Sequence, residues 1–333
     1  MLDGVVVLRG GTWWCTRNYH IPLAPQGPAM LFYSANTITG TQLSEKPCPC
    51  VACRFGHGTR HPARVRHYSS DTTDAQWQVL TALLPWPGWL DGLGGRPEEY
   101  CRRSVIDAIF YLADNGAKWR NLPADFPPWR TIYGLFSRWW IGGEVVAVHN
   151  DLRDALRVAA GRDFDPTAAI IDSQTLRAAE TVSAATRGWD AAKKMNGRKR
   201  HIVVDSLGLL LVCYVTAASV QDRDGAATAL TRLRELFHAI VLVWADGAYS
   251  GSLACWAREK LHLTLEIVRR PDAQTGFVVL PKRWLVERSL AWICLRRRCI
   301  RDYERLPEHH EAWVIWSMVM LMSRRLARTQ PRK

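Results

Sequence analysis

Residues 168–175 read AAIIDSQT, and the fold is decided by this stretch. Two alanines and two isoleucines run without interruption into Asp172, after which small polar residues follow. A short continuous apolar run bounded by turn-forming residues is typical of a strand buried on both faces. The sequence therefore predicts a central strand with a carboxylate at the point where the strand leaves the core.

Two further acidic residues stand in apolar surroundings. Residues 240–250, IVLVWADGAYS, repeat the form of a buried strand, here followed by Asp246 and a glycine. Glu287 lies in RWLVERSLAW, a stretch that is apolar almost all round and predicts a buried helix. Buried carboxylates are costly unless they are paired or bound to metal. We therefore expect Asp172, Asp246 and Glu287 to converge and to hold divalent metal ions for phosphoryl transfer.

The composition describes a globular chain with a polyanionic partner. The 333 residues are 48% hydrophobic and 23% charged, and the formal net charge is +13. Such a charge favours nucleic acid or an anionic membrane surface as partner. No apolar run reaches the roughly 20 residues that cross a bilayer, and the N-terminus does not read as a signal peptide. The nine cysteines are an odd number and mostly scattered, which predicts reduced thiols in a soluble cytoplasmic protein.

Residues 1–67 are poorly patterned, and turn-forming residues interrupt every candidate element. Within them, CPCVACRFGH offers Cys48, Cys50, Cys53 and His57, with His61 nearby. These residue types at short spacing are typical of a small zinc site; a disordered or spurious segment is the alternative. The abrupt change to well-patterned sequence further suggests, as a hypothesis, that translation starts at Val65 from a GTG codon.

Residues 68–160 predict a domain of helices. Thr73 and Gln76 match a capping box that opens the first helix. Pro97 suits the first position of a second helix, which Gly116 would end. A third helix covers residues 129–140, and a fourth runs from about 144 to 160.

The third of these helices carries Arg130 and Arg138 beside its apolar face. Short helices with basic ends suit a helix-turn-helix-like DNA-binding domain in which the third helix reads a groove. A helical bundle with ordinary solvated arginines is the alternative.

Residues 165–327 predict an α/β domain, with a basic tail at 328–333. Residues 193–200, KKMNGRKR, read as a basic loop, and HIVVD with LLLVCYVT reads as a β-hairpin. Alternating helices and strands follow, so we expect a mixed sheet flanked by helices. Asp222 and Asp224 suit caps of the following helix, and Asp205 suits the hairpin turn.

The order of short motifs in this region resembles that of the DDE transposases of bacterial insertion sequences, in the insertion-sequence-five branch. The motifs are IIDSQ, GRKRHIVVDSLGLLL with ASVQDRDGA, WADGAYSG, and RWLVERSLAWICLRRRCIRDYER. Upstream, YSSDTTDAQWQVLTALLP and GAKWRNLPADFPPWRTIYGLF resemble the helical domain of that branch. The resemblance covers about Tyr68 to Ala327. It implies a ribonuclease-H-like catalytic domain and dependence on Mg²⁺ or Mn²⁺. It also implies binding to inverted repeats and Asp172, Asp246 and Glu287 as the acidic triad.

One departure concerns the residues around the glutamate. The related four-type pattern places a Tyr and an Arg before it and a Lys after it; here Arg283 matches the Arg, but Leu280 and Cys294 occupy the other two places. Arg283 could steady the Glu287 carboxylate, contact the scissile phosphate or form only a structural ion pair. The full set of basic residues from which we expect DNA contacts is Arg130, Arg138, Lys193, Lys194, Arg198, Lys199, Arg200, Arg283, Arg296, Arg297 and Arg298.

These observations predict a transposase that binds transposon ends, cleaves the DNA and joins the 3′ ends to target DNA. Two ions would activate the attacking hydroxyl and stabilise the leaving oxygen, with Asp172 bridging both ions, Asp246 on one and Glu287 on the other. We expect double-stranded DNA as partner and a homodimer in the synaptic complex. Two alternatives stay open: a ribonuclease-H-like nuclease without strand transfer, and an inactive transposase-derived DNA-binding protein.

Overall fold

The computed structural model describes residues 48–56, 64–268 and 282–329, all of which lie in one compact unit, residues 46–333. His57, His61 and Leu280 fall outside the described residues. The helices are α1 (Val51–Phe55), α2 (Asp74–Leu83), α3 (Arg102–Asn115), α4 (Trp129–Ile141), α5 (Glu144–Ala159), α6 (Asp222–Leu236), α7 (Ser252–Leu261), α8 (Arg283–Cys294) and α9 (Pro307–Thr329). Short 3-10 turns are η2 (Trp119–Asn121), η3 (Ala184–Thr186), η4 (Gly247–Tyr249) and η5 (Arg297–Cys299).

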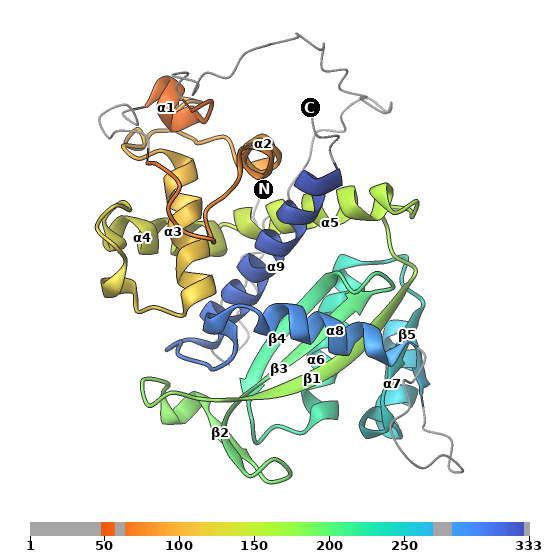
Figure 1. The fold of residues 1–333 in the computed structure, drawn as a ribbon. Coiled ribbons are helices and arrows are strands. Elements are labelled where there is room, and N and C mark those ends of the chain that lie inside the picture. The colour runs from red at the N-terminus through yellow and green to blue at the C-terminus, as the bar shows by residue number, and fades with distance from the viewer. Residues whose placement is uncertain (1–47, 57–63, 269–281, 330–333) are drawn as a thin grey trace, which may run out of the picture. The chain divides into compact units, whose positions relative to one another are not determined.

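The predicted mixed sheet is present. Its strands are β1 (Ala168–Arg177), β2 (Gly188–Asp190), β3 (Met195–Asp205), β4 (Leu210–Ala217), β5 (Leu242–Ala245) and β6 (Thr264–Ile267). The order is β2-β3-β1-β5-β6, with β4 also paired to β3. The pairs among β1, β2, β3 and β4 are antiparallel, whereas β1–β5 and β5–β6 are parallel (Figure 1). This is the ribonuclease-H-like arrangement.

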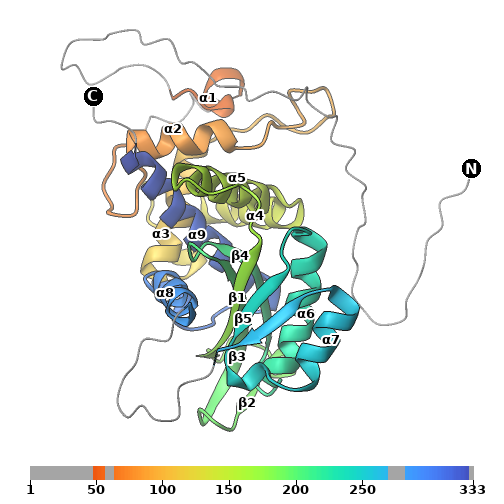
Figure 2. The same cartoon turned by 90° about the vertical axis from the view of Figure 1, so that its right-hand side faces the viewer.

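The two faces of the sheet pack against different helices. Side chains alternate along a strand, so Ile170 and Ile202 join the core shared with α8 and α9, while Ile171 and Val203 join the core shared with α6 and α7. Figure 2 shows α6 and α7 on one side of the strands and α8 on the other. Residues of even number in β1 therefore face α8.

The basic stretch 193–200 is mostly strand rather than the expected loop. β3 begins at Met195 and pairs residues 197–205 with β1 in one unbroken register. The charged residues near its start point into the two packed faces, where carboxylates and carbonyls from distant parts of the chain meet them. The hairpin of β3 and β4 is confirmed.

The helices at the N-terminal side begin and end largely as their caps predict. The Thr73 hydroxyl accepts from the Gln76 backbone N–H at 3.1 Å, and Gly116 ends α3 with a φ of 67°. The Gln76 side chain donates to the Ser323 hydroxyl of α9. Pro97 does not open α3, which begins at Arg102; the Arg102 guanidinium instead binds Glu98 and the carbonyl of Pro85, which ties down the preceding loop.

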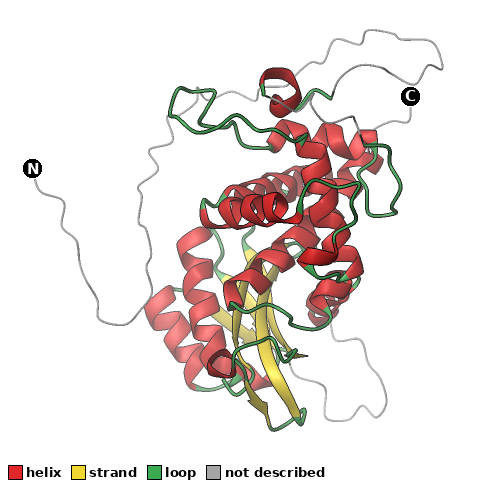
Figure 3. Cartoon of the chain, turned by 90° about the vertical axis from the view of Figure 1, so that its left-hand side faces the viewer, coloured by secondary structure: helices red, strands yellow, loops and turns green. Residues whose placement is uncertain are grey.

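Helices α2 to α5 share one hydrophobic core with α8 and α9. α9 packs against α2, α3, α5, α8 and strand β4, and Trp313 and Trp316 within it are fully buried. In Figure 3 helices α2 to α5 gather at one end of the strands. Within the described ranges, no helix combines the length and the hydropathy that crossing a membrane requires.

Candidate active site

Asp172 and Asp246 lie on adjacent parallel strands. Ile170 of β1 aligns with Trp244 of β5, so extending the register by two residues places Asp172 beside Asp246. Both face the α8 side of the sheet, because Ile170 and Trp244 pack on that side. The backbone N–H of the following residue fixes Asp172: Ser173 donates to Oδ1 at 2.7 Å.

Asp246 stands directly after β5 and caps the turn η4. Its Oδ1 accepts from the Ala248 backbone N–H at 2.9 Å. Oδ2 faces Arg283 of α8, whose Nη2 lies 3.9 Å away. The strand end and the turn together present this carboxylate toward α8.

Glu287 reaches the same place from α8. It follows Arg283 by one helical turn, and the same nitrogen, Arg283 Nη2, lies 3.5 Å from Glu287 Oε1. One guanidinium nitrogen therefore bridges the acids of β5 and α8. The expectation that Glu287 is buried is wrong: 56% of its side chain is exposed, because α8 turns one face to solvent, as the exposed Trp284 also shows.

The electrostatics of Asp172 tie the three acids together. Burial is the main cause that raises the pKa of Asp172, to about 6. The negative charges of Asp246 and Glu287 raise this pKa further, whereas Arg283 lowers it. Asp172 thus lies within the field of both other acids.

The donor set suits a hard divalent cation. All three groups are carboxylates, the ligands that Mg²⁺ prefers, and Asp172 carries a charge that its surroundings do not fully neutralise. Two of the carboxylates are held by backbone N–H groups and so are oriented before any cation binds. We conclude that Asp172, Asp246 and Glu287 could hold divalent metal.

A second polar group on the opposite face of β1 was not predicted as part of the site. Ser173 donates to Asp222 Oδ1 at 2.7 Å, and Lys199 Nζ lies 2.9 Å from the same oxygen. The expectation that Asp222 caps α6 is wrong, because Gln221 is the N-cap and Asp222 binds the sheet. Burial is the main cause that raises the pKa of the Tyr249 phenol, and the charges of Asp172 and Asp222 raise this pKa further. Sequence alternation along β1 was the signal that could have found this group.

Several basic residues expected to contact DNA are buried instead. Arg198 and Asp302 are both fully buried, with Nη1 and Oδ2 3.0 Å apart. Arg298 binds Glu304 in a buried pair, and Arg296 binds Asp114. Lys199 and Arg200 are buried as well, and each of these five side chains donates to a partner within the fold: Arg198, Lys199, Arg200, Arg296 and Arg298. We therefore do not include them in the DNA surface proposed below.

Arg200 nevertheless lies close to the acids. It pairs across the sheet with Gln174, two residues beyond Asp172. Its Nη2 contacts the Gln174 side chain and lies 3.1 Å from Cys294 Sγ, at the place where the related pattern has a lysine. A cation is therefore present near this place, supplied by β3 rather than by α8.

The remaining predicted DNA contacts are accessible. Arg283 is partly exposed, and the exposed set is Arg130, Arg138, Lys193, Lys194 and Arg297. Arg130 and Arg138 stand on α4, and the two lysines follow β2.

The chain is similar to known proteins in both of its parts. Residues 163–322 match the family model of the transposase DDE domain, and residues 72–149 match that of a putative transposase of the IS4/5 family. An uncharacterized protein, y4sN, of Sinorhizobium fredii is 25% identical over 114 residues, which are 34% of this chain and 82% of that protein. The Drosophila P element transposase strand transfer complex is similar with 15% identity and a TM-score of 0.26. That match covers 59% of this chain, which spans only 44% of that one.

The mixed sheet flanked by helices, together with the match to the transposase DDE domain, places the chain in the class of DDE transposases. With both family models matched in order, the chain belongs to the DDE transposases of the IS4/IS5 type.

Proposed function

We propose that this transposase binds the inverted-repeat ends of an insertion sequence, cleaves the DNA there and joins the 3′ ends to target DNA. The observation that carries the proposal is the convergence of three carboxylates on the α8 face of the sheet. Asp172 lies within the field of Asp246 and Glu287, and Arg283 contacts both of those acids.

Asp172, Asp246 and Glu287 would hold two Mg²⁺ or Mn²⁺ ions. Such ions activate an attacking water or 3′-hydroxyl and stabilise the leaving oxygen. Asp172 would hold both ions, because the charges of both other acids act on it, and Asp246 and Glu287 would hold one ion each.

The protein residues orient the reacting groups. The N–H groups of Ser173 and Ala248 hold the two aspartates. Glu287 is exposed, so its carboxylate is open to a DNA strand lying over α8. Arg283 supplies a guanidinium that can meet a phosphate oxygen, because its side chain is partly exposed and its nitrogen lies 3.9 and 3.5 Å from the two acids, too far for strong hydrogen bonds.

Double-stranded DNA is the proposed partner. Arg130 and Arg138 of α4, Lys193, Lys194 and Arg297 would neutralise phosphates along the duplex. Each synaptic complex would bring two ends together and so requires two copies of the chain, as a homodimer in the bacterial cytoplasm.

The substitution Asp172→Asn tests the proposal. It keeps the side-chain shape but removes the central charge, so we expect cleavage of end DNA in Mg²⁺ to fall by about a thousandfold or more. End binding, measured by fluorescence anisotropy, should stay within about twofold because the phosphate contacts remain. Asp224→Asn, an exposed acid on α6, is the matched control and should cleave as the unchanged protein does.

Full cleavage by the Asp172→Asn protein would refute the assignment of the acids. A second assay supplies a pre-cleaved 3′ end and target DNA. Joined product supports strand transfer, whereas cleavage without joining would identify a nuclease instead.

A further inference from the structure

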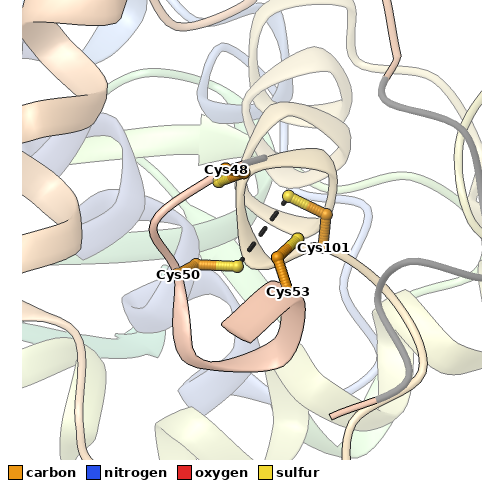
Figure 4. Close-up of side chains that lie close together, drawn as sticks. All are labelled: Cys48, Cys50, Cys53 and Cys101. Carbon is orange, nitrogen blue, oxygen red and sulfur yellow. Dashed lines mark hydrogen bonds between the residues drawn. The ribbon is translucent and has the colours of Figure 1, made fainter. Parts of the chain in front are cut away.

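Four cysteine sulfurs meet away from the acidic site. Cys48, Cys50 and Cys53 surround the start of α1, and Cys101 stands directly before α3. Their sulfur atoms all lie within 4.8 Å of one another. Cys50 Sγ and Cys101 Sγ are 3.9 Å apart although 51 positions separate them in the chain (Figure 4).

The segment that carries three of them is packed against the rest of the fold. Cys50 is 2% exposed and Ala52 is fully buried. A Cβ on Gly56 would lie 2.6 Å from the carbonyl oxygen of Glu98, so this backbone lies against the residues just before α3. Residues 48–56, expected to be part of an unpatterned extension, therefore belong to the core of the described fold.

The four sulfur atoms are close enough for their charges to interact strongly, because all lie within 4.8 Å of one another. Four sulfurs at this spacing cannot all ionise without a cation between them. A soft divalent ion stabilises all four thiolates, and the thiol protons then pass to solvent.

The spacing fits tetrahedral coordination. Zinc–sulfur bonds of about 2.3 Å place the sulfurs of a tetrahedral site about 3.8 Å apart. The Cys50–Cys101 separation of 3.9 Å already meets this value, and the limit of 4.8 Å for the whole group requires a contraction of only about 1 Å. A disulfide between Cys50 and Cys101 would need the sulfurs at about 2.05 Å, and it would leave the other two thiols without a role.

We propose that Cys48, Cys50, Cys53 and Cys101 bind one structural Zn²⁺ that fastens residues 48–56 to the start of α3. Cys101 takes the place for which His57 was expected, and no short-range spacing could reveal it, because the fourth ligand comes from a different helix. The site is separate from the acidic site, because the cysteines lie at α1 and before α3, whereas the acids lie on β1, after β5 and on α8. Its sulfur ligands also suit a softer cation than the carboxylates do.

The first measurement is metal content in the full chain purified under reducing conditions with zinc in the growth medium. We expect about one zinc per chain by elemental analysis. Replacement by Co²⁺ should give a thiolate-to-cobalt charge-transfer band and the intense visible bands of tetrahedral cobalt. A chain that takes up neither ion, or in which thiol titration finds Cys50 and Cys101 oxidised, would overturn the proposal.

Variants identify the ligands. Cys101→Ser should lower zinc content at least about tenfold in the folded fraction, whereas Cys101→His should keep it, because zinc accepts three cysteines and one histidine. Cys255→Ser, at an exposed cysteine on α7, is the control and should keep one zinc. Full zinc in the Cys101→Ser protein, with a nitrogen ligand seen by X-ray absorption, would show that another residue completes the site.

Should Cys101→Ser fail to fold, the unchanged chain still decides the matter. Hydrogen exchange before and after chelation should show faster exchange in residues 48–56 and 98–103 than in β1. Equal exchange in both states would count against a structural ion.

Discussion

At Asp172, successive side chains of β1 point to opposite faces of the sheet, and each face carries a different polar group. Asp172 faces α8 together with Asp246, while Ser173 faces α6 and donates to Asp222. His201 lies opposite Ser173 in the register and is fully buried on the α6 side. A Cβ on Gly225 would lie 2.1 Å from its Nε2, so only glycine lets α6 approach there.

The buried His201 predicts sensitivity to acid. Burial lowers its pKa from 6.5 to about 4; Asp222 raises this pKa and Lys199 lowers it. The unfolded chain therefore binds a proton that the folded chain rejects, and the free energy of unfolding falls as the pH drops from about 6.5 toward 4. His201→Gln should lose less stability than the unchanged protein between pH 7 and pH 4.5, by on the order of 2 kcal/mol. Urea denaturation at the two pH values measures this; equal losses in both proteins would contradict it.

The hairpin and the strands that precede Asp172 and Asp246 could be predicted from the residues, whereas the short strand β2 and the order of the strands in the sheet were not. The three acids stay a prediction. The apolar run before Asp172 marks the first half of β1, which continues to Arg177, and the apolar run before Asp246 marks the four-residue strand β5. The exposure of Glu287 could not be predicted, because Trp284 and Leu285 look equally apolar in the sequence, although only Trp284 is exposed. Which side of α8 faces the sheet depends on the packing of the whole molecule.

Among the elements, helix α8 contributes Arg283, a side chain that contacts acids on two different elements. Arg283 Nη2 approaches Asp246 and Glu287 at 3.9 and 3.5 Å, so one guanidinium links the acid that follows β5 to the acid of α8. Loss of this group leaves the acids of the two elements without their shared cation.

Arg283→Ala should slow cleavage about 10- to 100-fold, because small displacements of reacting groups have effects of this size. Arg283→Lys should restore part of the rate, since it keeps the charge but not the planar fork. Arg258→Ala, at an exposed site on α7, is the control. Cleavage rates at saturating Mg²⁺ decide, and an unchanged rate for Arg283→Ala would assign Arg283 to a structural ion pair only.

Strand β3 shows why local composition misled the prediction of a basic loop. Arg198 and Lys199 stand in a run of charges that resembles a solvated segment. Their partners are Asp302 and Asp222, and Arg198 is 104 positions away from Asp302 in the chain. The two members of each pair are too far apart in the chain to fall within one short stretch of sequence. The neutralisation that lets these charged residues form a buried strand therefore cannot be predicted from the neighbouring residues.

Asp302→Asn should lower the free energy of unfolding by about 3–5 kcal/mol, because it leaves the buried Arg198 without its charge partner. DNA affinity of the folded fraction should not change. Chemical denaturation and anisotropy with end DNA measure the two quantities. If Arg198→Met instead weakened DNA binding without loss of stability, Arg198 would be a phosphate contact after all.

Across the whole molecule, the basic residues divide into a buried group and an exposed group. The net charge is +13, but several arginines are buried and join elements within the fold. Arg130 and Arg138 of α4 stay exposed while Ile132 and Phe136 of the same helix lie in the core. The surface of α4 is therefore available to a duplex.

End binding should weaken with salt, with a slope of log affinity against log salt of about −0.9 per neutralised phosphate. The double substitution Arg130→Ala and Arg138→Ala should make this slope shallower by about 1–2. Arg223→Ala, exposed on α6, should leave the slope unchanged. Anisotropy titrations across a salt series provide the comparison, and an unchanged slope in the double variant would exclude α4 from the DNA surface.

The burial of α9 bears on the fate of shortened gene products. Its residues complete the apolar faces of α2, α3 and α5, so a chain stopped before Pro307 exposes those faces and invites aggregation or proteolysis. Copies of the mobile element with a premature stop there would not yield a small, long-lived competitor that occupies the ends. Such damage would silence a copy without making it an inhibitor of its intact neighbours.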